Sequence, residues 1–283
     1  MPTETIFSVA PSPVKFGPGA LNEIGKDARN LGMKRVALFT DPWVAKLECM
    51  HTARQALLAE GLDLVVFDEC RIEPTDKSFL EAARFASEGN FDGYVSVGGG
   101  SAMDTAKAAN LFATYPDEFL AYVNAPIGQA KAVPGPLKPH IACPTTSGTG
   151  SECTGIAVFD LTESQLKTGI ASPRLKPSLG VIDPTTTFTL PPLVIASTGV
   201  DVLVHALESY TAIRYDQRQA AADPSQRPPA QGGNPHSDVG AIEALRLGGQ
   251  FLVRAVNDPS DHEARIQLMW AATLAGIAFG NAG

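Results

Sequence analysis

The most distinctive candidate for chemistry is a glycine-rich turn in YVSVGGGSAMDTAKAAN, residues 94–110. A strand-like run enters three glycines and continues as a helical pattern. Glycines let the backbone approach a bulky anion, and a helix N-terminus attracts phosphate. A tight turn without a ligand explains the same residues, because Ser101 could cap the helix and Asp104 could complete a capping box. The spacing is neither G-x-G-x-x-G nor Walker A, and the composition favours phosphate binding.

A second loop of interest, CPTTSGTGSE at residues 143–152, also follows an expected strand. Seven of its ten residues are Thr, Ser or Gly. Hydroxyls and exposed amides at this density can hold a diphosphate or a ribose, although a plain hydroxyl-rich loop explains them equally well. Ligands of open α/β sheets bind outside the carboxyl ends of the strands. Two such loops at strand ends therefore strengthen each other as a nucleotide site.

Asp201 and His205 lie four residues apart in the helical pattern STGVDVLVHALESY. This spacing places a carboxylate and an imidazole on one helix face, where both can bind one divalent ion. Glu208 could orient the imidazole from behind. A solvated surface pair is the alternative that spacing alone favours, and two ligands do not complete a catalytic metal site.

Two charged residues are further candidates for cofactor binding. Asp41 follows the strand-like run RVALFT, where a carboxylate can accept a hydrogen bond from an adenosine ribose and repel a 2′-phosphate. An Asp-Pro turn or a helix cap before Trp43 explains it equally well. Lys167 could reach a cofactor or be solvated, and the sequence does not distinguish these roles.

Strands alternate with helices in the first 185 residues, which predicts βαβ units and a parallel sheet. Short apolar runs mark the expected strands at 35–40, 64–67, 94–97, 140–143 and 179–182. Amphipathic windows predict helices at 43–60, 78–88 and 101–113. A Pro/Gly-rich stretch at 125–139 reads as a loop.

The pattern of apolar residues changes after residue 185. From there on it predicts helices, at 192–213, 237–256 and 261–279. A polar insert at 214–237 separates the first two. We therefore expect an α/β dinucleotide-binding domain at 1–185 and an all-α metal-binding domain at 186–283. The last apolar helix needs partners to bury its faces, so we expect this helical domain to be incomplete.

Composition narrows the classes of partner. The chain has 283 residues, with 30 Asp and Glu against 22 Lys and Arg, for a net charge of −8. This acidic balance without a basic run argues against nucleic acid and membrane surfaces as partners. No apolar stretch approaches the ~20 residues that cross a bilayer, and the start lacks a secretory signal. Four scattered cysteines predict reduced, mostly buried thiols and a cytoplasmic location.

Four motifs in order, GGGSAMDTAK, PTTSGTGSE, IDPTTT and GVDVLVHALESYT, resemble the iron-containing (group III) alcohol dehydrogenase family. Further segments, such as RIEPTDKSFLEA and RPPAQGGNPHSD, resemble its hydroxyacid–oxoacid transhydrogenase branch. The likeness runs from about Lys15 to Gly283. Thr75 stands where many relatives carry Asn, and the branch shares this Thr.

The resemblance implies a dehydroquinate-synthase-like fold, with an α/β nucleotide-binding domain and a helical metal-binding domain. It implies that Asp201 and His205 are the first two metal ligands, with two histidine ligands beyond Gly283. Asp41 would favour NAD over NADP. The cofactor-binding residues that it implies are Asp41, Gly99, Gly100, Ser101, Asp104, Thr145, Thr146, Ser147, Thr149 and Lys167.

The activity implied by the resemblance is metal-assisted hydride transfer, with Fe²⁺ or alternatively Zn²⁺. Bound NAD would carry hydride from a 4-hydroxybutyrate-type acid to a 2-oxoglutarate-type acid. Both substrates are carboxylates, so a cationic clamp is expected among Arg214, Arg218 and Arg254. The alternatives are an NAD-dependent iron-containing alcohol dehydrogenase and an inactive NAD-binding fragment. Relatives also suggest a homodimer and the mitochondrial matrix as the alternative location.

Overall fold

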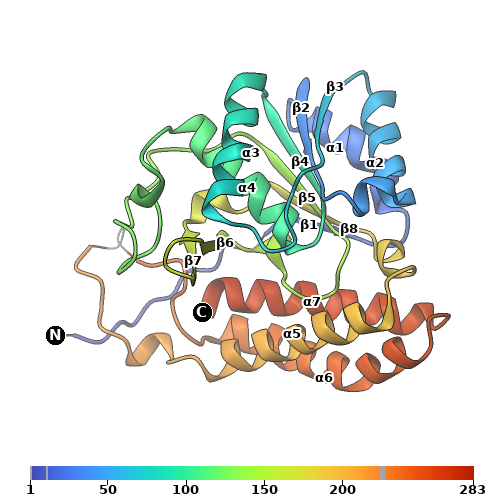
Figure 1. Ribbon diagram of the computed structural model, residues 1–283. Helices are drawn as coiled ribbons and strands as arrows, with labels where there is room; N and C mark the ends of the chain where they lie inside the picture. The colour runs from blue at the N-terminus through green and yellow to red at the C-terminus, as the bar shows by residue number, and fades with distance from the viewer. Residues whose placement is uncertain (1, 11, 224–226) are drawn as a thin grey trace. The chain divides into compact units, whose positions relative to one another are not determined.

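The computed structural model describes residues 2–10, 12–223 and 227–283 (Figure 1). The chain divides into two compact units. The α/β unit comprises residues 13–145 and 155–183. The helical unit comprises residues 1–12, 146–154 and 184–283. The helical unit therefore includes two segments that precede residue 185. A single boundary at residue 185 does not separate the two units.

A six-stranded parallel sheet forms the centre of the α/β unit, in the order β1-β8-β5-β4-β2-β3 (Figure 1). The strands are β1 (Val14–Phe16), β2 (Arg35–Phe39), β3 (Asp63–Phe67), β4 (Gly93–Gly98), β5 (His140–Pro144) and β8 (Leu179–Ile182). All five expected strands are present. The edge strand β1 was missed, because three residues carry too little pattern to predict a strand.

Helices cover both faces of this sheet. They are α1 (Ile24–Asn30), α2 (Glu48–Ala59), α3 (Asp76–Gly89) and α4 (Gly100–Thr114). Val36 and Leu38 of β2 pack in one core with α1 and α2, whereas Ala37 and Phe39 pack in another with α3 and α4. Alternate side chains of a strand point to opposite faces, so the buried run of β2 supports two helical layers.

The expected helices differ from the observed ones by one to three residues at most ends, and one expected helix is broken in two. The predicted helix 43–60 is divided into a 3₁₀ turn, Val44–Lys46, and α2. Leu47 between them is extended, with φ −90° and ψ 158°.

Thr75 precedes α3 and accepts a hydrogen bond from Ser78 N at 3.1 Å. Thr is a good N-cap residue, so Thr75 accounts for the start of α3 at this position.

An antiparallel hairpin, β6 (Ile156–Leu161) and β7 (Leu166–Ala171), completes the α/β unit. Asp160 of β6 is opposite Lys167 of β7. The sequence analysis did not predict either strand.

All four cysteines are free thiols, three of them buried, as predicted.

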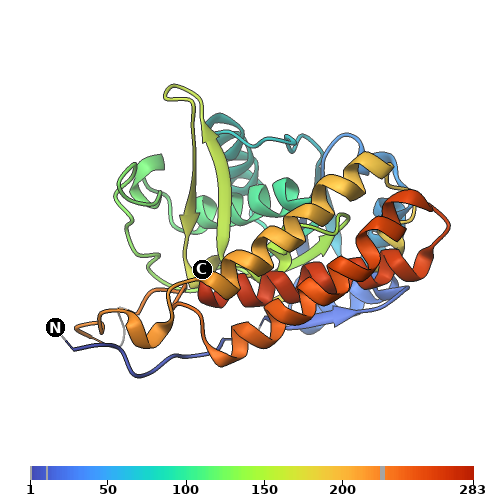
Figure 2. The same cartoon turned by 90° about the horizontal axis from the view of Figure 1, so that it is seen from below.

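Three long helices form the core of the helical unit: α5 (Pro192–Thr211), α6 (Pro235–Asn257) and α7 (His262–Ala282). Figure 2 shows them side by side. Their shared core is rich in alanine, and small residues allow close approach. Asn234 caps α6 by accepting hydrogen bonds from His236 N and Ser237 N, both at 3.1 Å.

Helix α5 corrects one expectation from the sequence. Its length and composition would allow it to cross a membrane, although no stretch of that kind was expected. It packs against α6 and α7 through Ile195, Val202 and Ala206. It also carries Asp201 and Glu208. Apolar helices with packing partners and charged residues are typical of protein cores as well, so this finding is weak evidence for a membrane.

Candidate functional site

The glycine-rich turn joins the end of β4 to the start of α4. Gly99 is the N-cap residue in an extended conformation, and no side chain caps the helix. A capping box of Ser101 and Asp104, the alternative to phosphate binding, is therefore absent from the described part of the chain. Ser101 Oγ instead donates a hydrogen bond to the Ile72 carbonyl, and Asp104 faces the hairpin, as described below. Ala102 N and Met103 N donate to Gly99 O, and within the described part of the chain no side chain caps the start of α4. A helix N-terminus without a side-chain cap is suited to binding phosphate.

Asp41 lies beside this turn. Its Oδ1 accepts hydrogen bonds from Trp43 N at 2.8 Å and Val44 N at 3.0 Å, so the carboxylate does organise the turn after β2. Its Oδ2 lies 3.8 Å from the position that a Cβ atom on Gly98 would occupy. The same Cβ would lie 2.7 Å from Ala102 Cβ. Gly98 therefore allows Ala102 of α4 to pack against the end of β4, directly beside the Asp41 carboxylate.

The hydroxyl-rich loop starts next to the same glycine, because Thr145 N donates to Gly98 O at 2.9 Å. From Thr146 onwards the loop belongs to the helical unit. There Ser147 Oγ is buried and has no hydrogen-bond partner within the described chain. Thr146 is half-buried, and Thr149 Oγ1 accepts from Ser151 N at 3.2 Å. A buried hydroxyl without a partner costs free energy, so Ser147 is suited to receive a ligand.

Two glycines of this loop allow it to approach α5 and α7 closely. A Cβ on Gly148 would lie 2.8 Å from Thr198 Cβ of α5. Gly150 has a φ of +60°, and its Cβ would lie 2.5 Å from Gly276 Cα of α7. The backbones of the loop and of α7 thus approach more closely than any side chain permits.

Lys167 lies on β7 with its ammonium group near two carboxylates. Its Nζ is 2.6 Å from Glu73 Oε2 and 3.8 Å from Asp160 Oδ1. The hydrogen bond with Glu73 raises the pKa of this lysine above its usual value. Lys167 thus stays charged, and its role in cofactor binding remains a prediction.

Helix α5 places Asp201 and His205 one turn apart. Asp201 Oδ1 and His205 Nε2 are separated by 3.6 Å, which suits two ligands of one ion. The imidazole stacks on Phe279 of α7, with ring centroids 4.8 Å apart. The Nδ1 atom of His205 is buried and makes no hydrogen bond within the described chain. Glu208 is exposed and is therefore not its partner. The expectation that Glu208 orients the imidazole is therefore wrong.

The chemistry of this pair fits a divalent metal, because carboxylate and imidazole together suit Fe²⁺ or Zn²⁺. Phe279 fixes the ring plane, and the sequence carried no signal for it, since an apolar residue 74 positions away has no motif. Among residues 2–10, 12–223 and 227–283, no group of three or more His, Cys, Asp and Glu could hold a metal. That Asp201 and His205 are the first two ligands of a larger set therefore remains a prediction.

Two family models cover most of the chain. Residues 11–184 match the family described as iron-containing alcohol dehydrogenase. Residues 230–283 match the C-terminal part of the same family. The chain belongs to the iron-containing alcohol dehydrogenase family.

Members of this family include close relatives of the chain. The mitochondrial hydroxyacid-oxoacid transhydrogenase of Rattus norvegicus is 52% identical over 283 residues, which is 99% of this chain and 61% of the relative. The corresponding protein of Homo sapiens is 50% identical, again over 99% of this chain and 61% of the relative. The chain thus spans about three fifths of the length of these curated relatives.

Solved structures share the fold of this iron-containing alcohol dehydrogenase chain. A 1,3-propanediol oxidoreductase superposes with a TM-score of 0.86 at 30% identity, covering 98% of this chain and 67% of that one. A sulfoacetaldehyde reductase from Bifidobacterium kashiwanohense, in complex with NAD⁺, gives a TM-score of 0.81 at 29% identity, covering 97% and 67%. The α/β unit followed by a helical region is therefore the family's architecture, as the sequence predicts.

An ion pair between Asp104 and Lys107 joins α4 to the hairpin in this member of the family. Lys107 Nζ lies 3.2 Å from Asp104 Oδ1 and donates to Ile156 O at 2.8 Å. Asp104 Oδ2 accepts from Val158 N at 2.9 Å. The Lys107 side chain is fully buried. Asp104 and Lys107 lie three residues apart in a helical pattern, so the sequence allowed an ion pair between them. The pair was not predicted, because Asp104 was interpreted as a helix cap.

Proposed function

We propose that this chain carries the NAD-binding half and part of the metal site of a hydroxyacid–oxoacid transhydrogenase. The observation that supports this most strongly is 50–52% identity to curated transhydrogenases across 98–99% of the chain. The substrates proposed are a 4-hydroxybutyrate-type acid as hydride donor and a 2-oxoglutarate-type acid as acceptor. The names of these relatives place them in mitochondria, which favours the mitochondrial matrix over the cytoplasm as the location.

The proposed cofactor is NAD, as in the NAD⁺ complex of the sulfoacetaldehyde reductase. The uncapped start of α4, with Gly99, Gly100 and Ser101, would receive the pyrophosphate. Asp41 Oδ2 would accept from a ribose hydroxyl. The hydroxyls of Thr145, Thr146, Ser147 and Thr149 would line the remainder.

The proposed metal ligands in this chain are Asp201 and His205, with Fe²⁺ favoured by the family and Zn²⁺ as the alternative. Bound metal would supply Lewis acidity to the substrate oxygen, and bound NAD would accept and return the hydride. The stack on Phe279 orients the imidazole edge that bears Nε2. The protein's contribution is mainly positioning.

A two-substrate assay tests this function. The complete protein, of which this chain is proposed to carry the NAD-binding half and two metal ligands, is loaded with Fe²⁺ and NAD, freed of unbound cofactor by gel filtration, and given 4-hydroxybutyrate with 2-oxoglutarate. We expect 2-hydroxyglutarate to form without added NAD. Asp201→Ala should abolish turnover and lower bound iron, measured by elemental analysis, whereas the exposed control Glu208→Ala should do neither.

Two results would contradict the proposal. Turnover that requires free NAD in step with product would indicate an ordinary NAD-dependent alcohol dehydrogenase, which the likeness to 1,3-propanediol oxidoreductase makes the second candidate. NAD binding with no turnover of either acid would indicate an inactive NAD-binding protein. Homodimer formation, also proposed, is measured by light scattering.

Asp41→Asn is expected to shift cofactor preference towards NADP. The amide keeps Oδ1 as an acceptor for the turn but removes the negative charge beside Gly98. Hydrogen bonds to charged groups contribute about 1.5–3 kcal/mol, so NAD affinity should fall roughly tenfold or more while NADP affinity rises. Fluorescence titration with both reduced cofactors measures this. Asp68→Asn, an exposed residue just after β3, serves as the control and should leave the ratio unchanged.

A further inference from the structure

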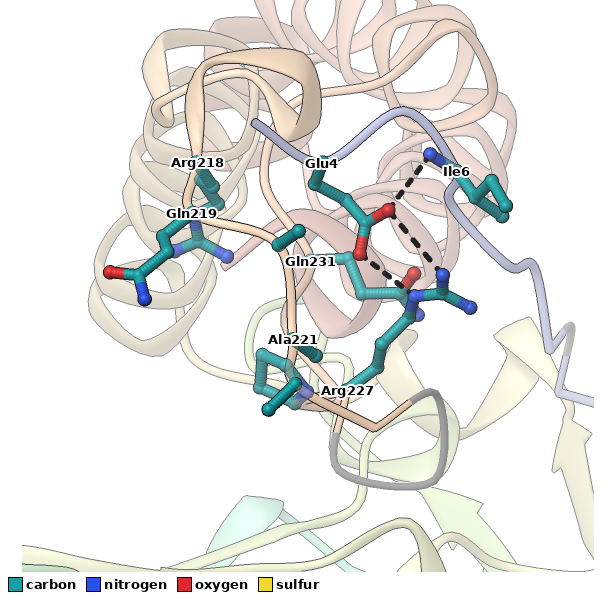
Figure 3. A pocket seen from close by; sticks show the side chains of 10 residues that line it. Glu4, Ile6, Arg218, Gln219, Ala221, Arg227 and Gln231 are labelled. Atoms are coloured by element: carbon teal, nitrogen blue, oxygen red, sulfur yellow. Dashed lines mark hydrogen bonds and ion pairs between the residues drawn. The ribbon is translucent and has the colours of Figure 1, made fainter. Parts of the chain in front are cut away.

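A cavity of about 310 Å³ lies within the helical unit, between the N-terminal segment and the polar insert (Figure 3). Backbone hydrogen bonds hold the two segments together, from Glu4 N to Arg218 O at 2.9 Å and from Ala220 N to Pro2 O at 3.0 Å. The Gln231 side chain accepts from Ser8 N at 2.8 Å. The walls of the cavity are thus tied by contacts from residues far apart in sequence.

Charges in this cavity do not cancel. Arg227 donates to both carboxylate oxygens of Glu4, at 2.9 and 3.4 Å (Figure 3). The hydrogen bond from Arg227 lowers the pKa of Glu4 to about 2, so this pair is ionised and neutral overall. Arg218 donates only to the Ala230 carbonyl, at 2.6 Å, and pairs with no carboxylate within the described residues. Among the residues that the structure describes, the positive charge of Arg218 is left without a counter-charge.

The other two arginines expected as a carboxylate clamp are already engaged. Arg214 lies 3.6 Å from Asp216 and 3.3 Å from Asp238. Arg254 lies 2.9 Å from Asp261 and 2.7 Å from Glu263. These contacts raise the pKa of Arg254. Of the three, Arg218 alone combines a cavity wall with an unmatched charge.

We propose that this cavity binds a short-chain hydroxy or oxo acid, with Arg218 as the residue that anchors its carboxylate. A guanidinium group matches a carboxylate geometrically. Ile6, Ala221 and Pro228 provide apolar wall for a short carbon chain. The volume suits a small ligand.

The helical unit also links this cavity to the Asp201–His205 pair. Gln231 N donates to Asn281 O of α7 at 2.8 Å. Phe279, two residues earlier, stacks on His205. The inference deepens the proposed function and rests on it for the choice of acid, whereas the unmatched charge of Arg218 is independent of it.

Isothermal titration of the whole chain, without NAD, tests the site with 4-hydroxybutyrate and 2-oxoglutarate as probes. We expect saturable binding that Arg218→Gln weakens at least tenfold. Arg254→Gln should change it less than twofold, because that arginine is matched by two carboxylates. The neutral analogue 1,4-butanediol, which lacks the carboxylate, should not bind measurably.

Equal weakening by both substitutions, equal binding of the diol, or no saturable binding of either acid would overturn the proposal. NAD titration of the same samples keeps the two hypotheses apart. Loss of acid binding in Arg218→Gln with normal NAD affinity supports the site. A parent chain that binds the acids but not NAD also supports it, while contradicting the proposed function.

Discussion

Lys107→Met is expected to lower the free energy of unfolding by about 3–5 kcal/mol, because removing one partner of a buried ion pair leaves the other charge uncompensated. The ammonium of Lys107 pairs with Asp104 and donates to Ile156 O, and its side chain is fully buried. Methionine fills a similar volume but offers neither the charge nor the donor. Urea unfolding monitored by circular dichroism measures the change.

An exposed ion pair in the same unit gives the control for this prediction. Lys167→Met breaks the contact with Glu73, in which both side chains are more than half exposed. Exposed pairs contribute about 0–1 kcal/mol, so its effect should be small. Combining Lys107→Met with Asp104→Asn should recover part of the loss. Equal effects of Lys107→Met and Lys167→Met would mean that the buried pair contributes no more than a surface pair.

Gly276→Ala is expected to lower the free energy of unfolding by about 1–3 kcal/mol, the usual cost of overpacking. The added Cβ would lie 2.7 Å from Gly150 Cα and 2.9 Å from Gly150 O, and neither backbone atom can rotate away. The loop that carries Ser147 and Thr149 must therefore shift. NAD affinity should fall roughly tenfold if these hydroxyls bind the cofactor, as a fluorescence titration would show.

Gly249→Ala is the matched control, because this helical glycine has nothing within 4 Å of its Cβ position. There the alanine should stabilise α6 by roughly 0.5–1 kcal/mol through its better helix propensity. A Gly276→Ala variant as stable as the parent, with unchanged NAD affinity, would show that the loop tolerates displacement and does not depend on this close approach.

The pattern of apolar residues along the sequence predicted most strands of the sheet. It predicted few of the contacts that position the side chains of the candidate site. Buried strands such as β2 and β4 read clearly because they are short apolar runs between helical patterns. The hairpin β6–β7 was missed, since only four of its twelve residues are buried and they follow no continuous apolar run. The break at Leu47 was also missed, because apolar residues continue across it.

Spacing predicted the Asp201–His205 pair because both residues lie on one helix. Phe279 and the hairpin partners of Asp104 could not be found in this way. Ile156 and Val158 contact the ion pair through backbone atoms, 49 and 54 residues along the chain. Backbone contacts carry no side-chain signature, so only the fold reveals that Asp104 is a tie between elements and not a cap.

The division of the chain into units has a consequence for synthesis on the ribosome. Every residue of the α/β unit has been made once residue 183 is added, so this unit can fold during translation. The helical unit contains both the first twelve residues and α7. Residues 2–10 of the helical unit therefore cannot complete their contacts until α7 has been made, because Ser8 O accepts a hydrogen bond from Asn281 Nδ2 of α7. A single cut after residue 183 would keep the α/β unit whole, but it would separate α5, α6 and α7 from the two earlier segments of the helical unit.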